Sequence, residues 1–148
     1  MNKLILIPPP VFALALFAIG YGLDLLFPAL PRPHLPLLGF ILMASGLALG
    51  LMALAHFRLR RTTPIPHGEP SALVLSGPYL WTRNPMYLGL FTALLGLACY
   101  LGGLPLLLAA PGFCAVVNRI HIPHEEAKLA GLFGADYAAF RDRIPRWL

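Results

Sequence analysis

Residues 76–89 carry the densest group of side chains in this sequence that could bind a charged or aromatic molecule. Between two long apolar runs the sequence here is SGPYLWTRNPMYLG. Pro85 indicates the start of a hydrophobic helix, because proline is tolerated in a first helical turn, where its missing N–H needs no partner. The free N–H groups and the positive dipole of a helix start suit a carboxylate or a phosphate.

A second polar group follows the last apolar run. His121 and Glu125 are four residues apart, so they share one face of a helix if the helix is continuous. Two adjacent carboxylates, Glu125 and Glu126, need partners at a membrane edge. Arg83, Arg119 or a cationic ligand could supply them, and a solvated acidic pair is the alternative interpretation. Metal binding by His121, His124 and Glu125 is an alternative, but their spacing matches no zinc pattern, so we predict no metal site.

The composition predicts an integral membrane protein with a single domain. Hydrophobic residues make up 58% of the 148 residues and charged residues 11%, with a mean hydropathy of +0.74. A soluble domain carries about a quarter charged residues. The net charge of +5 indicates basic loops facing anionic membrane lipids rather than nucleic-acid binding, since no nucleic-acid motif is present. Cys99 and Cys114 lie in apolar runs and are interpreted as buried thiols.

The elements that must position the two polar groups are helices that cross the membrane. We predict an all-α integral membrane fold, a bundle of about four transmembrane helices over residues 8–27, 35–57, 85–101 and 105–122. Gly102 and Gly103 divide an apolar stretch that is too long for one helix, which predicts a tight turn. The long polar loop 58–84 is expected to be functional. Residues 123–148 are expected to form an amphipathic segment on the cytoplasmic membrane surface.

Two features inside the first two spans bear on helix packing. Asp24 interrupts the first span near its end, and we expect it at the membrane interface, with a paired carboxylate inside the bundle as the alternative. Gly46 and Gly50 form a small-x-x-x-small pair that permits close approach of a neighbouring helix. Close approach of a ligand to the glycine backbone is the second interpretation.

The distribution of basic residues predicts the topology. Four spans place both termini and the central loop on one side of the membrane. That side carries Lys3, Arg58, Arg60, Arg61, Arg83, Lys128, Arg141, Arg143 and Arg146. The other side carries Arg32 alone. By the positive-inside rule, both termini are cytoplasmic, and we expect the protein in the plasma (inner) membrane of a prokaryote.

The chain resembles a family of integral-membrane methyltransferases that includes isoprenylcysteine carboxyl methyltransferases and, more distantly, phospholipid N-methyltransferases. Five pieces within residues 62–148 carry the resemblance. They are Leu73-Val74-x-Ser76-Gly77-Pro78-Tyr79, Arg83-Asn84-Pro85-Met86-Tyr87-x-Gly89, Glu125-Glu126-x-x-Leu129, Phe133-Gly134-x-x-Tyr137 and Arg143-x-Pro145-Arg146.

The resemblance implies S-adenosylmethionine as the methyl donor and S-adenosylhomocysteine as the product. Carried over by position, the cofactor-lining residues are Ser71, Ala72, Leu73, Val74, Tyr79, Asn84, Pro85, Met86, Tyr87 and Glu125. Many relatives have His where this chain has Asn84, and Asn also donates hydrogen bonds. The eukaryotic prenylcysteine enzymes place a substrate-contacting Arg where this chain has His121, one helical step from Arg119.

The residue chemistry agrees with such a donor. Arg83 and the Pro85 helix start suit its carboxylate, and Glu125 or Glu126 suits its ammonium or ribose. Aromatic rings suit adenine or face the sulfonium, and the candidates are Tyr79, Trp81 and Tyr87. In-line methyl transfer depends mostly on positioning and desolvation.

The acceptor enters from the bilayer and is lipophilic in this interpretation. A carboxylate, as in isoprenylcysteine carboxyl methylation, is the first candidate and needs no base. A phospholipid amine is the alternative, and it needs a base, for which His121 or Glu126 is the candidate. Arg119 is the substitute for the substrate-contacting Arg. The non-enzymatic alternative is a small membrane protein that has kept the fold.

Overall fold

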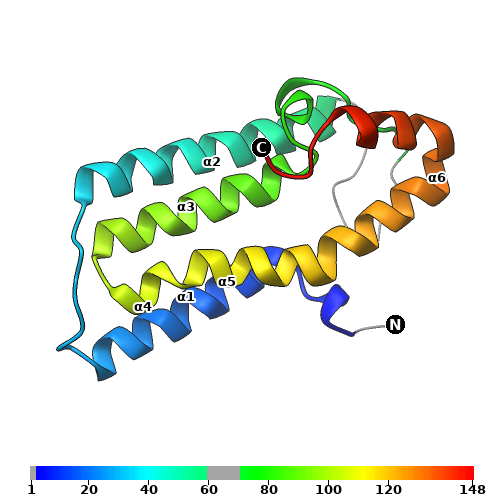
Figure 1. Cartoon of the computed structure of the whole chain (residues 1–148). Helices are drawn as coiled ribbons and strands as arrows, with labels where there is room; N and C mark the ends of the chain where they lie inside the picture. Colours follow the sequence, from blue (N-terminus) through cyan, green and yellow to red (C-terminus); the bar gives the residue numbers. More distant parts are fainter. Residues whose placement is uncertain (1–2, 60–70) are drawn as a thin grey trace.

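The computed structural model describes residues 3–59 and 71–148, and every regular element in these ranges is helical (Figure 1). In chain order the elements are η1 (Lys3–Leu6), α1 (Pro9–Leu26), α2 (Pro36–Leu59), η2 (Gly77–Leu80), α3 (Pro85–Leu101), α4 (Leu104–Leu107), α5 (Ala109–Val116), η3 (Val117–His121) and α6 (Ile122–Arg143). The first two η segments are 3-10 helices and η3 is a π-helix.

Within the described residues, three helical segments are long and apolar enough to cross a membrane, namely α1, α2 and the continuous stretch Leu104–Arg143. Helix α3 is apolar but has 17 residues. The predicted all-helical membrane fold is therefore confirmed. Our expectations for Arg60, Arg61 and His67 lie outside the described residues.

Helices α2 and α3 pack backbone to backbone through glycines. A Cβ atom added at Gly46 would lie 2.4 Å from the nitrogen of Ala93, and one at Gly96 would lie 2.4 Å from the nitrogen of Met43. The close approach predicted from Gly46 and Gly50 involves the backbone of both, since a Cβ added at Gly89 would lie 2.6 Å from the oxygen of Gly46 and 2.8 Å from the nitrogen of Gly50. Of these two, only Gly46 itself has no room for a Cβ. At Gly50 an added Cβ would meet nothing within 4 Å of it among the described residues. The tight contact allows α2 and α3 to form a rigid pair.

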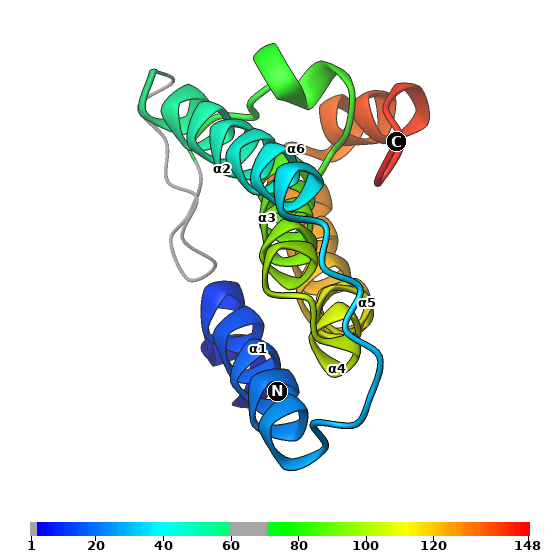
Figure 2. The same ribbon diagram turned by 90° about the vertical axis from the view of Figure 1, so that its left-hand side faces the viewer.

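Helix α1 packs on the other side of the molecule, against α4 and α5 (Figure 2). Asp24, near the end of α1, is buried at 7% exposure. Its Oδ2 lies 3.2 Å from Nη2 of Arg32, in the loop that leads to α2. Asp24 is thus a buried carboxylate paired with a half-exposed arginine of the loop, and its expected place at the membrane interface stays a prediction.

The turn between α3 and α4 follows from its two glycines. Gly102 adopts a left-handed conformation with φ of 80° and ends α3, as glycine does at helix C-termini. Helix α5 then returns along α3 and α1, and Phe113 forms the centre of the main apolar core. Cys99 is buried and Cys114 half-buried, and both are free thiols.

The last helix continues through a proline by widening one turn. In η3 the N–H of Ile122 bonds to the carbonyl of Val117, five residues earlier. Pro123 follows at once, and a wide turn relieves the clash between a proline ring and the carbonyl four residues before it. The apolar part of this helix ends near Ile122. The charged residues of α6 lie beyond it.

Helix α6 then bends back towards the start of α3. Gly134 has φ of 49° and ψ of −117°, which breaks the regular helix. After the bend, Tyr137, Phe140 and Ile144 form a small buried cluster against Leu73. The C-terminal segment therefore covers the end of the bundle where α3 begins (Figure 1).

Candidate functional site

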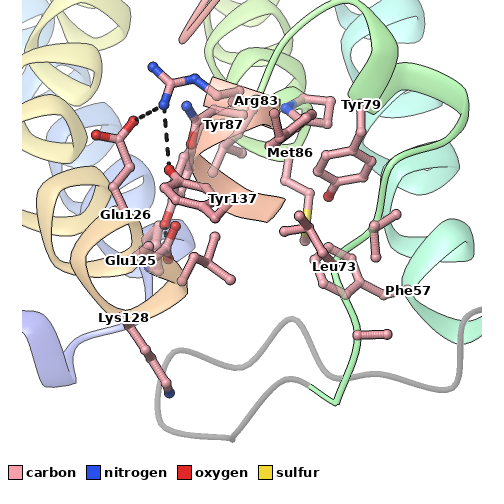
Figure 3. Close-up of a pocket in the computed structure, with 18 of the residues that line it drawn as sticks. Phe57, Leu73, Tyr79, Arg83, Met86, Tyr87, Glu125, Glu126, Lys128 and Tyr137 are labelled. Carbon is pink, nitrogen blue, oxygen red and sulfur yellow. Dashed lines mark hydrogen bonds and ion pairs between the residues drawn. The ribbon is translucent and has the colours of Figure 1, made fainter. Parts of the chain in front are cut away.

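A cavity of about 430 Å³ lies at the end of the bundle where α3 begins. This volume is within the usual range of small-molecule sites. The cavity is lined by Pro8, Pro9, Pro10, Phe57, Ala72, Leu73, Val74, Tyr79, Arg83, Asn84, Pro85, Met86, Tyr87, Leu90, Glu125, Glu126, Lys128, Leu129, Tyr137 and Phe140. Figure 3 shows Arg83, Glu125, Glu126 and Lys128 on one side and apolar or aromatic side chains on the other.

The loop before α3 builds the aromatic wall. Gly77, with φ of 61°, turns the chain into η2, which places Tyr79 in a buried position with 7% exposure. Phe57 meets the Tyr79 ring edge to face, with centroids 5.6 Å apart. Burial raises the pKa of Tyr79 above its usual value. Packing against Phe57 therefore fixes the orientation of the Tyr79 ring. The raised pKa keeps the Tyr79 hydroxyl protonated.

Tyr87 and Glu125 form the second wall. The hydroxyl of Tyr87 donates a 2.6 Å hydrogen bond to Oε1 of Glu125. Burial raises the pKa of Glu125 to about 7, and the hydrogen bond from Tyr87 partly offsets that effect. A buried carboxyl that titrates near neutrality is suited to receive a cation, since a positive ligand would stabilise its charged form.

The neighbouring carboxylate, Glu126, is occupied by two arginines. Its Oε1 lies 2.9 Å from Nη1 of Arg83, and its Oε2 lies 2.6 Å from Nη2 of Arg146. Arg83 also donates a hydrogen bond of 3.4 Å to the hydroxyl of Tyr137. The hydrogen bond to Glu126 raises the pKa of Arg146 further above its usual value. Both guanidinium groups therefore have an internal partner, and Arg83 is held at the edge of the cavity.

The backbone of residues 145–146 fixes the loop that leads into α3. The side chains of Thr82 and Asn84 donate hydrogen bonds of 2.9 and 3.0 Å to the carbonyl of Arg146. The N–H of Arg83 bonds to the carbonyl of Pro145 at 2.9 Å. Asn84 lines the cavity, but its amide N–H group is used to hold the loop in place.

The structure brings most of the sequence-predicted cofactor residues together. All of them except Ser71 line the cavity, namely Ala72, Leu73, Val74, Tyr79, Arg83, Asn84, Pro85, Met86, Tyr87 and Glu125. Trp81 is 63% exposed and does not line it.

The three residues predicted to act on the acceptor lie in three different environments. Glu126 lines the cavity, held by its two arginines. His121 is buried at 1% exposure but is absent from the cavity wall. Arg119 is exposed and lies away from the cavity. The helix does continue through His121 and Glu125, and both residues contact Tyr87: the His121 ring lies 6.5 Å from the Tyr87 ring, and Glu125 accepts the hydrogen bond of the Tyr87 hydroxyl.

Several lining residues were missed by sequence reasoning. Leu129 and Tyr137 belong to the matched sequence pieces, so their motifs offered a signal that was not used. No sequence motif indicated that the cavity would be lined by Phe57, at the end of α2, or by prolines 8–10. They reach the cavity only because the helices bring distant parts of the chain to one end of the bundle.

The side chains of the cavity suit a ligand that is both cationic and aromatic. Among the described residues no group of three or more His, Cys, Asp or Glu could hold a metal ion. A mostly apolar cavity with aromatic rings and a buried carboxyl that can take a cation fits a molecule with an ammonium, a sulfonium and an aromatic base. S-adenosylmethionine has these groups, so the residues present fit the cofactor that the resemblance implies.

Comparison with known proteins places the chain in a family. The family model for phospholipid methyltransferases matches residues 35–136, more than two thirds of the chain. A protein of Haemophilus influenzae, described only as uncharacterized, is 35% identical over 63 residues, which is 43% of this chain and all of that protein. No solved structure is significantly similar. With helices that can cross a membrane and a cavity lined mostly by the matched region, the chain belongs to the phospholipid methyltransferase family.

Proposed function

We propose that this protein transfers a methyl group from S-adenosylmethionine to a lipophilic acceptor. The observation that carries the proposal is the Tyr87–Glu125 pair in the wall of an otherwise apolar, aromatic cavity. An apolar ligand would not stabilise the charge of a buried carboxyl, whereas a cationic methyl donor would stabilise its charged form. The family match supports a methyltransferase of the membrane.

The residues of the cavity have separate tasks in this proposal. Glu125 pairs with the ammonium of the cofactor, and Tyr87 holds the Glu125 carboxylate in place. The first-turn N–H groups of α3, after Pro85, bind the cofactor carboxylate. Tyr79 presents its buried ring to the sulfonium or the adenine. When bound, the cofactor supplies an electrophilic methyl group, and the chain orients it and excludes water.

A carboxylate acceptor is the first candidate. Methylation of a carboxylate needs no base, and neither predicted base is well placed to take a proton. Glu126 is held by Arg83 and Arg146, and His121 lies outside the cavity wall. Lys128 also lines the cavity, and its positive charge stabilises the charged form of Glu125.

A phospholipid amine is the second candidate, because the matching family model bears that name. It requires a group that can accept a proton near neutral pH. Glu125, with a pKa of about 7, is such a group in the cavity. In this case Glu125 would serve the acceptor, and the cofactor ammonium would need another partner.

Calorimetric titration of S-adenosylhomocysteine into detergent-purified protein tests the cofactor assignment. We expect micromolar binding that Glu125→Ala abolishes and that Asp136→Ala, on the same helix but outside the cavity, leaves unchanged. A wild-type protein that is folded in detergent and in lipid but does not bind would favour the non-enzymatic alternative.

Transfer of a labelled methyl group tests the acceptor. Vesicles would contain either a prenylcysteine derivative with a free carboxylate or phosphatidylethanolamine. A carboxylate acceptor predicts base-labile label in the first sample and none in the second. Stable label in the lipid amine would instead support phospholipid N-methylation.

A further inference from the structure

His121 is a buried titratable side chain that the proposed reaction does not use. Its exposure is 1%. It lies in η3, the wide turn that precedes Pro123, and its ring is packed between Phe12, at a centroid distance of 5.3 Å, and Tyr87, at 6.5 Å. A π-turn often marks a functional position in a helix. The question is what this imidazole holds.

The polar partner of His121 is a backbone carbonyl far away in the sequence. Nε2 of His121 lies 3.1 Å from the carbonyl oxygen of Ile7. A carbonyl can only accept, so Nε2 carries the proton and donates it. Nδ1 is buried and has no hydrogen-bond partner among the described residues. The bond to Ile7 is therefore the polar interaction that fixes the ring in its site.

Ile7 immediately precedes three prolines that line the cavity. Pro8, Pro9 and Pro10 contribute surface to the same space as Tyr87 and Glu125. The 3-10 helix η1 packs beside η3 (Figure 1). Prolines 8–10 have no N–H with which to anchor themselves. The segment thus depends on neighbouring residues for its position.

We infer that His121 is a positioning residue that holds the N-terminal segment in place, so that prolines 8–10 form one wall of the cavity. The imidazole reaches across from η3 and fixes the carbonyl of Ile7. The effect of this wall on ligand affinity rests on the proposed cofactor site, but the tether itself does not. His121 thus acts through the shape of the cavity and not on the acceptor.

Hydrogen exchange in the ligand-free protein tests the tether. In His121→Phe a ring of similar size keeps the packing with Phe12 but cannot donate to Ile7. We expect at least fivefold faster exchange in peptides covering residues 3–13, where the N–H groups of Ile7 and Val11 bond within the segment, with unchanged exchange in α3. His121→Gln, whose amide nitrogen reaches about as far as Nε2, should restore slow exchange. His124→Phe is the matched control, because it replaces a second histidine about one helical turn further along, and it should leave exchange in residues 3–13 unchanged.

Cofactor affinity tests the consequence. We expect His121→Phe to bind S-adenosylhomocysteine about threefold to tenfold more weakly, the usual effect of one hydrogen bond, and His121→Gln to bind like wild type. If the wild-type protein does not bind S-adenosylhomocysteine, the proposed function fails. The exchange experiment still shows whether His121 holds the N-terminal segment, because it needs no ligand. Unchanged exchange in His121→Phe would overturn the inference, and lowered turnover with unchanged exchange would return His121 to the acceptor. If His121→Phe does not fold, fast N-terminal exchange in His121→Gln would equally overturn it.

Discussion

The 2.6 Å hydrogen bond from the Tyr87 hydroxyl to Oε1 of Glu125 joins the first turn of α3 to the first turn of α6. Replacing Tyr87 by Phe removes the donor and keeps the ring. The Glu125 carboxylate then loses a stabilising partner, and we expect about threefold to tenfold weaker binding of S-adenosylhomocysteine. Calorimetry of both proteins measures the change. Equal affinities would show that Glu125 does not need this bond to bind the ligand.

Cofactor affinity should depend on pH through Glu125. Burial raises the pKa of this carboxyl to about 7, so in the empty site it is mostly protonated at pH 6 and mostly charged at pH 8. A cation binds the charged form, so the affinity should fall by up to about tenfold per pH unit below pH 7 and be flat above pH 8. Titrations at several pH values measure this.

The variant Glu125→Gln controls for other titrating groups. It should bind weakly at every pH, and its affinity should change little between pH 6 and pH 8. A wild-type affinity that does not change over this range, or the same slope in the variant, would contradict the assignment of the ammonium to Glu125.

Loss of Glu126 should destabilise the fold. Glu126→Gln leaves the guanidinium groups of Arg83 and Arg146 without their carboxylate. Removing one partner of a buried pair costs about 3–5 kcal/mol, and partial exposure here reduces this to about 2 kcal/mol. A lower Tm of the detergent-purified protein measures the effect. Asp142→Asn, in an exposed pair 3.7 Å from Arg141, should leave the Tm unchanged.

The glycine contact between α2 and α3 gives a second stability test. Gly46→Ala forces the helices apart, because the new Cβ would lie 2.4 Å from a backbone nitrogen. We expect a loss of roughly 1–3 kcal/mol. Gly50→Ala, one helical turn later and open among the described residues, should leave the Tm equal or higher. If both variants melted alike, close packing at Gly46 would not be what holds the pair.

Sequence reasoning worked where the signal is local. The hairpin at Gly102 follows from two glycines in an apolar run, and the pairing of Arg83 with Glu126 was among the partners offered by charge alone. The cavity wall formed by Tyr79 and residues 83–87 was predictable because these residues lie in one recognisable stretch, although Trp81 in the same stretch is exposed and does not line the cavity.

It failed where the outcome depends on tertiary geometry. Spacing placed His121 and Glu125 on one helical face, and both do contact Tyr87. Spacing gave no sign that the His121 ring also bonds to the carbonyl of Ile7, 114 residues away. Prolines 8–10 and Phe57 line the cavity although no pattern near them indicates binding. Such residues acquire a role only when separate helices meet.

The hydrogen bonds from Thr82 and Asn84 to the carbonyl of Arg146 span 64 and 62 residues of the sequence. Residue 146 is synthesised after both α2 and α3. The loop at the mouth of the cavity acquires its partners only after that residue has emerged. Completion of the cavity therefore depends on the last residues of the sequence to be made, whereas the pairing of α2 and α3 does not.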